Sequence, residues 1–179
     1  MKATGIVRRI DDLGRVVIPK ELRRTMRIRE GDPLEIFTVG DGEVVFKKYS
    51  PVGEMTAFAA QYADVLARAC EAPVLICDRD HVVAAAGIAK KEVYDRRISR
   101  ALEDLIESRR TFVAKAASER LQPIDTLPRY AAVCAPILAS GDVSGAVCLL
   151  LGEAGTLPSD SDYKLCAVAA AFLGKQMEE

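Results

Sequence analysis

Residues 5–37 read GIVRRIDDLGRVVIPKELRRTMRIREGDPLEIF, and this stretch decides the fold of the amino-terminal part of the chain. It opens with two short runs rich in β-branched residues, Gly5–Ile10 and Arg15–Ile18. Between them lies Asp11–Gly14, whose polar residues and closing glycine are typical of a tight turn. The pattern therefore predicts a β-hairpin.

A short basic helix and a second hairpin are expected next. Pro19 stands at the expected first helical position, where its fixed φ is favourable, and Gly31–Pro33 ends the helix. Two further β-rich runs, Leu34–Val39 and Glu43–Tyr49, are joined by Gly40–Gly42, whose glycines can adopt positive φ. The predicted order is strand, strand, helix, strand, strand.

This amino-terminal unit is too small to fold by itself. A chain of about 60 residues hides only about 60 per cent of its unfolded surface. Residues 1–50 also contain no cysteine pair and no metal-ligand set that could compensate. Two copies that interleave their hairpins would share one core, so we expect a homodimer through residues 1–50. The expected core residues are Ile6, Ile10, Val16, Ile18, Leu22, Met26, Leu34, Ile36 and Val44.

Positive charge is concentrated in residues 1–29, which carry nine basic and three acidic side chains, a net charge of plus six. Residues 30–50 carry minus three and residues 51–179 minus four, so the total of −1 hides the division. Seven of the nine basic residues are arginines, whose planar guanidinium suits phosphates and guanine edges. This predicts double-stranded DNA as a partner; the alternative is an ordinary solvated surface.

The amino-terminal unit resembles the swapped-hairpin DNA-binding domain of the AbrB family of bacterial transition-state regulators. The resemblance covers residues 3–49, and its most specific part is the run GRVVIPKELRR. In that family two chains interleave into one β-barrel-like dimer, and four arginines per chain face the DNA. The positions that match these four are Arg8, Arg15, Arg23 and Arg24, with Arg9, Lys20 and Arg27 as additional candidate contacts. The alternative at any one arginine is a salt bridge to Asp11, Asp12 or Glu21.

The predicted organisation is an AbrB-like domain at 1–50, a short linker at 51–53 and a second domain at 54–179. This second domain reads as helix, two strands, helix, three strands, helix, which predicts an α+β fold with an antiparallel sheet. Its elements are expected at Glu54–Glu71, Pro73–Asp78, His81–Gly87, Asp95–Arg110, Phe112–Ala117, Arg129–Leu138, Ser144–Leu151 and Asp160–Met177.

The second domain resembles the GAF domain family, through Ala135-Pro136-Ile137 followed by Gly141 and by Gly145-Ala146-Val147. GAF domains commonly hold a small molecule between the sheet and the middle segment, here about residues 87–127. The resemblance therefore implies an unidentified small-molecule ligand. The Asn-Lys-Phe-Asp-Glu type motif of the cyclic-nucleotide-binding members is absent. The alternative is an oligomerisation module with a filled pocket; in either case we expect the domain to join two dimers into a homotetramer.

The combination of the two domains resembles the sporulation regulators of the AbrB family. It implies a transcriptional regulator of spore-development genes, activating or repressing, that is not an enzyme and uses no cofactor or metal. We expect it in the cytoplasm, because the longest apolar run, Leu165–Leu173, is too short to span a membrane. The resemblance further implies the nucleoid of the forespore.

Two other functions remain open at this point. An antitoxin-like DNA-binding module would have a disordered tail, whereas residues 51–179 are apolar and periodic. A cysteine-based GAF enzyme, a sulfoxide reductase, would need an exposed thiol of low pKa. The cysteines instead stand in apolar runs and are expected to be buried reduced thiols: Cys70, Cys77, Cys134, Cys148 and Cys166.

Overall fold

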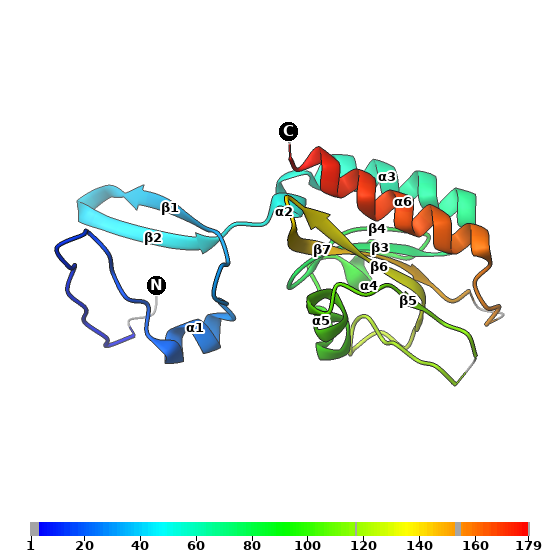
Figure 1. Cartoon of the computed structure of the whole chain (residues 1–179), viewed down its shortest axis with the longest axis horizontal. Helices are drawn as coiled ribbons and strands as arrows, with labels where there is room; N and C mark the ends of the chain where they lie inside the picture. The colour runs from blue at the N-terminus through cyan, green and yellow to red at the C-terminus, as the bar shows by residue number, and fades with distance from the viewer. Residues whose placement is uncertain (1–3, 117, 153–154, 179) are drawn as a thin grey trace. The chain divides into compact units, whose positions relative to one another are not determined.

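The computed structural model describes residues 4–116, 118–152 and 155–178, and of Asp41 only the backbone. The chain divides into two compact units, Met1–Tyr49 and Ser50–Glu179, which we call the amino-terminal unit and the carboxy-terminal unit (Figure 1). None of the helices in the described ranges is long and apolar enough to cross a membrane.

The amino-terminal unit contains the predicted helix and the predicted second hairpin. Helix α1 spans Lys20–Met26, with Pro19 as its N-cap rather than its first helical residue. Strands β1, Leu34–Val39, and β2, Glu43–Lys48, pair antiparallel around the 3-10 turn Gly40–Gly42. The helix ends at Arg27, whose backbone adopts the left-handed conformation with φ 52°.

The first predicted hairpin is only partly present in the single chain. Its turn forms, because the Gly14 N–H donates to the Asp11 carbonyl at 3.0 Å and the Asp11 N–H donates to the Arg15 carbonyl at 3.0 Å. The strands predicted at Gly5–Ile10 and Arg15–Ile18 are wrong for one chain, since neither segment has a strand partner within residues 4–49. Figure 1 shows this blue segment as an open loop.

Within residues 4–49 the amino-terminal unit has no closed hydrophobic core. Pro19 is buried, but the buried hydrophobic residues that form the core begin at Val52, and α1 buries none of its residues. Val7 is 86 % exposed and Val17 is 70 % exposed. The residues expected to form a shared core are all exposed or half-buried in the single chain.

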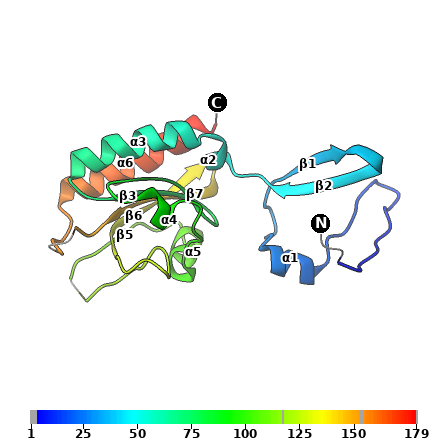
Figure 2. The same ribbon diagram turned by 180° about the vertical axis from the view of Figure 1, so that it is seen from behind.

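The carboxy-terminal unit is built on one antiparallel sheet with strand order β4-β3-β7-β6-β5, which confirms the predicted α+β class. The strands are β3 Val74–Asp78, β4 Val82–Ala86, β5 Phe112–Val113, β6 Ala131–Ala139 and β7 Asp142–Leu150. Helices α3, Thr56–Cys70, and α6, Asp160–Gln176, lie side by side on one face (Figures 1 and 2). The shorter helices α4, Lys90–Val93, and α5, Arg100–Glu107, lie toward the other face.

The residues predicted as a linker form a helical turn instead. Helix α2 spans Pro51–Glu54, and the Ser50 hydroxyl caps it by accepting the Gly53 N–H at 3.0 Å. The same hydroxyl donates to Asp78 Oδ2 at 2.9 Å, and Val52 is fully buried. This turn therefore belongs to the carboxy-terminal unit.

Two predicted elements of the middle segment are shorter than expected. Helix α5 begins at Arg100 rather than Asp95, because Ser99 caps it by accepting the Leu102 N–H at 3.1 Å. Residues 95–98 bond instead to the β4 side of the sheet, where the Arg96 carbonyl accepts the Val82 N–H at 2.9 Å. Of the strand predicted at 112–117, Phe112–Val113 forms and residues 114–116 do not continue it, while Ala117 lies outside the described residues.

The space expected to hold a GAF ligand is filled by side chains. The sheet face toward α4 and α5 carries a buried cluster to which the middle segment contributes Ile98, Leu102, Ile106, Ile124 and Leu127. These side chains pack against sheet residues of the same cluster. The packing favours the alternative of a filled pocket at this place.

Candidate nucleic-acid interface

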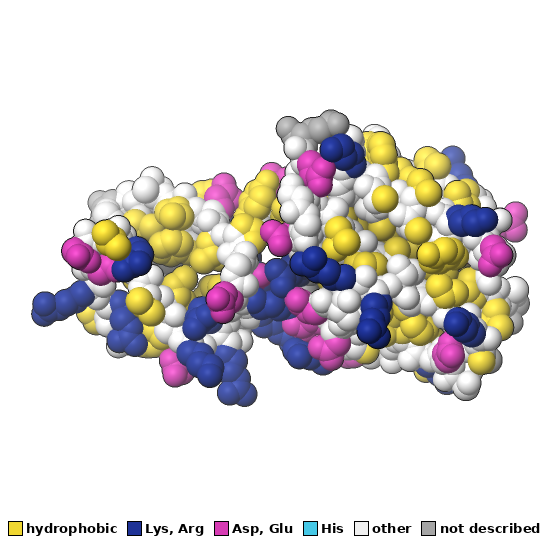
Figure 3. Space-filling model, in the orientation of Figure 1, with side chains coloured by type: hydrophobic (Ala, Val, Ile, Leu, Met, Phe, Trp, Pro, Cys, Tyr) yellow, Lys and Arg dark blue, Asp and Glu magenta, His cyan; other side chains and the backbone are white. Residues whose placement is uncertain are grey.

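The basic side chains of the amino-terminal unit come from its first segment and from α1. Arg8 and Arg9 lie in the extended segment before the turn, and Lys20 and Arg24 lie on α1. All four are exposed, and none of them forms an ion pair with another described residue. In the view of Figure 3, dark blue basic side chains gather along the lower edge of this unit, beside yellow hydrophobic ones. Unpaired cations on such a surface are available to an anionic partner.

Arg15 is already paired within its own turn. Its Nε donates to Asp11 Oδ2 at 2.7 Å, and its backbone N–H donates to Asp11 Oδ1 at 2.7 Å. Both hydrogen bonds lower the pKa of the Asp11 carboxyl, and the bond from the backbone N–H has the larger effect. Arg15 therefore forms the salt bridge that was the alternative to a DNA contact. Its side chain is still 69 % exposed and remains on the surface.

Arg23 and Arg27 are half-buried and differ from the exposed cations. Arg23 Nε is buried and has no hydrogen-bond partner among the residues described. Arg27 holds the end of α1, and its carbonyl accepts a hydrogen bond from Lys48 Nζ at 3.0 Å. The structure therefore brings the seven predicted contact residues into one unit but gives them unequal access to a ligand.

A clamp between α1 and the β1–β2 hairpin was not predicted from the sequence. Lys48 Nζ lies 3.7 Å from Asp32 Oδ2, and the same oxygen accepts the Arg29 N–H at 2.8 Å. Lys48 thus joins β2 to both ends of the segment that follows α1. A local signal in the sequence existed only for Asp32, which lies in the Gly-Asp-Pro turn. Its contact with Lys48 could not be predicted, because the lysine is distant in sequence.

The cysteines of the carboxy-terminal unit are free and poorly suited to catalysis. Cys77, Cys134, Cys148 and Cys166 are buried as predicted, whereas Cys70 is half-buried. Burial raises the pKa of the Cys70 thiol to about 11 and that of Cys166 to about 12. No group of three or more His, Cys, Asp or Glu side chains suited to a metal occurs in the part of the chain described.

Two family models match the chain, one for each unit. The model for the stage V sporulation protein T C-terminal transcription factor matches residues 54–178. The model for antidote-toxin recognition MazE, bacterial antitoxin, matches residues 7–54.

Individual relatives agree with this division. Stage V sporulation protein T of Bacillus subtilis is 48 % identical over 181 residues, which cover all of both chains. The solution structure of the N-terminal DNA recognition domain of the B. subtilis regulator AbrB is 63 % identical, with a TM-score of 0.25, over 28 % of this chain and 94 % of that one.

The carboxy-terminal fold also has structural neighbours. A GAF domain from an Acinetobacter phosphoenolpyruvate-protein phosphotransferase superposes with a TM-score of 0.53 at 11 % identity, over 72 % of this chain and 82 % of that one. This likeness confirms the predicted GAF-like fold and nothing beyond the fold. Full-length identity together with the match to residues 54–178 shows that the chain belongs to the stage V sporulation protein T family of transcription factors.

Proposed function

We propose that this chain regulates transcription of sporulation genes by binding double-stranded DNA through the basic side chains of its amino-terminal unit. The family is one of transcription factors rather than enzymes. Its AbrB relative carries a DNA recognition domain that is 63 % identical to this unit. The proposed place of action is the nucleoid of the developing forespore.

The observation that carries the proposal is the set of exposed cations without an ion pair in the amino-terminal unit. Arg8 and Arg24 are the clearest members, because both are exposed and both match DNA-facing positions of the AbrB family. When an exposed guanidinium pairs with a DNA phosphate, counterions that were condensed on the DNA are released. This release favours binding. Most of the binding free energy should therefore be electrostatic and weakly dependent on sequence.

A homodimer through residues 1–50 would complete the missing core. Val7, Ile10 and Val17 are between 69 % and 86 % exposed, which is costly for a folded unit in water. A second copy that pairs with the open first segment would bury these side chains and satisfy its free backbone groups. It would also place two sets of arginines on one assembly.

A second interface through the carboxy-terminal unit would join two dimers. Helices α3 and α6 share an aromatic cluster on their outer face, in which the rings of Tyr62 and Phe172 stack at 5.6 Å between centroids. Val65 is 66 % exposed and Val168 61 % exposed on the same two helices. An apolar helix face of this kind fits another copy of itself across a two-fold axis.

The homotetramer can be tested by light scattering. Each chain has a mass of 19.4 kDa, so four chains give about 78 kDa and two give about 39 kDa. Val168→Glu should reduce the tetramer to a dimer and leave DNA binding by each dimer intact. A tetramer mass that survives this substitution would exclude the α3–α6 face.

The antitoxin alternative receives no support from the carboxy-terminal unit. That unit is folded around buried clusters on both faces of its sheet, whereas an antitoxin of the expected kind would end in an extended tail. The match of residues 7–54 to an antitoxin model covers only the amino-terminal unit and the turn after it.

The DNA-binding proposal is tested by fluorescence anisotropy with a labelled duplex and the full-length chain. Arg8→Ala combined with Arg24→Ala should weaken binding by about tenfold or more, because each dimer loses four phosphate partners. Arg110→Ala combined with Lys115→Ala removes the same charge from exposed positions of the carboxy-terminal unit and serves as the control. Equal losses in both double variants would refute the proposed surface.

A further inference from the structure

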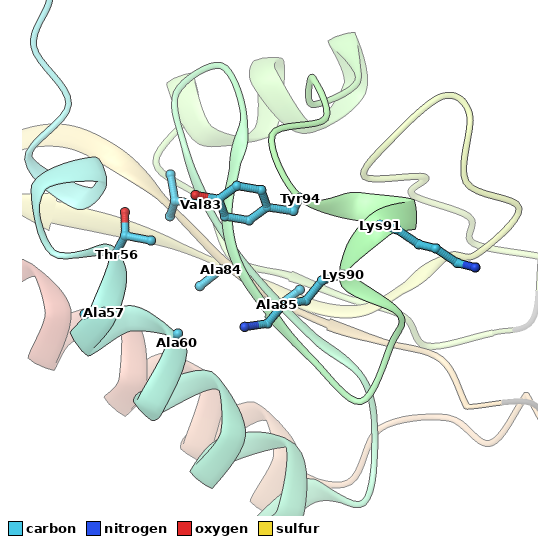
Figure 4. Close-up of a pocket in the computed structure, with 9 residues that line it drawn as sticks. All are labelled: Thr56, Ala57, Ala60, Val83, Ala84, Ala85, Lys90, Lys91 and Tyr94. Atoms are coloured by element: carbon cyan, nitrogen blue, oxygen red, sulfur yellow. The ribbon is translucent and has the colours of Figure 1, made fainter.

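An open groove runs along the outer edge of the sheet in the carboxy-terminal unit. It has a volume of about 680 Å³ and lies between the first turns of α3, the edge strand β4 and helix α4 (Figure 4). The residues that line it are Thr56, Ala57, Ala60, Val83, Ala84, Ala85, Lys90, Lys91 and Tyr94. Volumes of about 300–1,000 Å³ are typical of small-molecule sites.

The groove exists because small side chains meet at the edge of the sheet. Ala57 and Ala60 of α3 stand across from Ala84 of β4, and none of them is long enough to fill the gap (Figure 4). At the end of β4 the chain turns at Gly87, where φ is 70° and a Cβ would come within 3.0 Å of Pro73 Cα. The turn carries α4 to the far side of the groove. This place differs from the filled space on the sheet face toward α5, because α3 forms one of its walls.

One cation is directed over the groove and its neighbour is not. In Figure 4 the Lys90 side chain extends back past Ala85 toward α3, whereas the Lys91 side chain points away from the other lining residues. Neither lysine forms an ion pair within the described ranges. Tyr94 lies beside Val83 and adds a hydroxyl to the rim (Figure 4). The Thr56 hydroxyl already donates to the Gly53 carbonyl at 2.5 Å.

We propose that this groove binds a small molecule with an apolar body and a single anionic group, of the class of aliphatic carboxylates. The alanine and valine side chains would cover the apolar body, and the Lys90 ammonium would pair with the carboxylate. The described residues that line the groove include no acidic side chain, so among them the ammonium group of a zwitterionic amino acid would have no charged partner. The site is independent of the DNA-binding proposal, because all of its residues lie in the carboxy-terminal unit.

Isothermal titration calorimetry of the full-length chain with decanoate tests the proposal. We expect one decanoate per chain, and no comparable binding of decyltrimethylammonium, which has a similar tail and the opposite charge. Lys90→Gln should weaken decanoate binding by about tenfold or more, whereas Lys91→Gln, the same change at the adjacent position, should leave it within about twofold.

A filling substitution tests the apolar part of the site. Ala60→Leu should abolish decanoate binding, and circular dichroism should show that this variant is folded. If Ala60→Leu does not fold, Ala57→Leu, at an exposed position of α3, is used in its place. The proposal is overturned by any of four results. These are no binding of decanoate, equal binding of the cationic probe, equal effects of the two lysine substitutions, or binding unchanged by a folded filling variant.

Discussion

Arg15 holds Asp11 through two atoms at once: its Nε lies 2.7 Å from Asp11 Oδ2, and its backbone N–H lies 2.7 Å from Asp11 Oδ1. The pair closes the turn of the first predicted hairpin. It also occupies a guanidinium that matches a DNA-facing position in the AbrB family. Because both side chains are exposed to water, the pairing is weak and can be exchanged for a phosphate. If Arg15 contacts DNA as we propose, Asp11 competes with the phosphate for its guanidinium.

This competition predicts that Asp11→Asn raises DNA affinity. The asparagine keeps an oxygen that can accept the Arg15 backbone N–H, so the turn survives while the guanidinium is released. Asp12→Asn is the matched control, because it removes the same charge from an exposed residue that makes no bond to Arg15. Anisotropy titrations should show a larger gain for Asp11→Asn. Identical gains would mean that only net charge matters and that Arg15 is not a contact.

The salt dependence of DNA binding would report how many phosphates the proposed dimer contacts. If Arg8, Arg15, Arg23 and Arg24 from two chains each neutralise one phosphate, eight contacts give a slope of log K against log salt near −7, from about −0.9 per contact. This slope is measured by binding titrations at salt concentrations between about 50 and 200 mM. A slope near zero would be incompatible with an electrostatic interface. Arg24→Ala alone should make the slope less negative by about two, one for each chain.

Raised thiol pKa values predict slow alkylation of the native protein. Burial raises the pKa of Cys70 to about 11, so at pH 8 only about 0.1 per cent of this thiol is the reactive thiolate. Because the folded pKa lies above the ordinary value, the labelling rate of Cys70 should rise about tenfold per pH unit up to that pKa. The buried cysteines should label only after unfolding in urea. Mass spectrometry after iodoacetamide treatment checks this, and one thiol that reacts rapidly at pH 7 would revive the enzyme alternative.

Close packing of α6 on the sheet predicts that Gly174→Ala is destabilising. A Cβ at this position would overlap the Leu138 carbonyl oxygen of β6, so the helix would have to move away from the strand. In an exposed helix, Gly→Ala would stabilise the fold by about 1 kcal/mol. A loss of stability would therefore be due to the contact with β6 and not to helix propensity. We expect the melting temperature to fall by about 5 °C or more. Gly152→Ala, whose Cβ would meet no atom within 4 Å, should change it little; equal melting temperatures would contradict the packing.

Local signals predicted some elements well. Helix α6 begins at Asp160 as expected, because the Ser159 hydroxyl accepts the Asp162 N–H and the Asp162 carboxylate accepts the Ser159 N–H. The β6–β7 hairpin turns at Ser140 and Gly141, both with positive φ, between the strands predicted at Arg129–Leu138 and Ser144–Leu151. These features depend on residues within a few positions of one another, so the sequence alone can reveal them.

Features that depend on distant partners could not be predicted in the same way. Ile98 lies within the helix predicted at Asp95–Arg110, but its N–H donates to the Asp80 carbonyl at 2.9 Å, and residues 95–99 stay outside α5. Pro51 suggested a linker, yet it starts a turn that Ser50 ties to Asp78. At the candidate site, the residue types and the charge predicted DNA as the partner. They left open whether an arginine pairs with Asp11, Asp12 or Glu21, and only the geometry of the turn shows that Arg15 pairs with Asp11.

Two chains are proposed to interleave through residues 1–50, and amide hydrogen exchange of the full-length protein tests this arrangement most directly. In the single chain the backbone N–H groups of 7–10 and 16–18 have no hydrogen-bond partner among the described residues. Interleaving would pair them, so these amides should exchange at least about a hundredfold more slowly than in an unstructured peptide. Exchange of both segments at the unstructured rate would contradict the interleaved dimer.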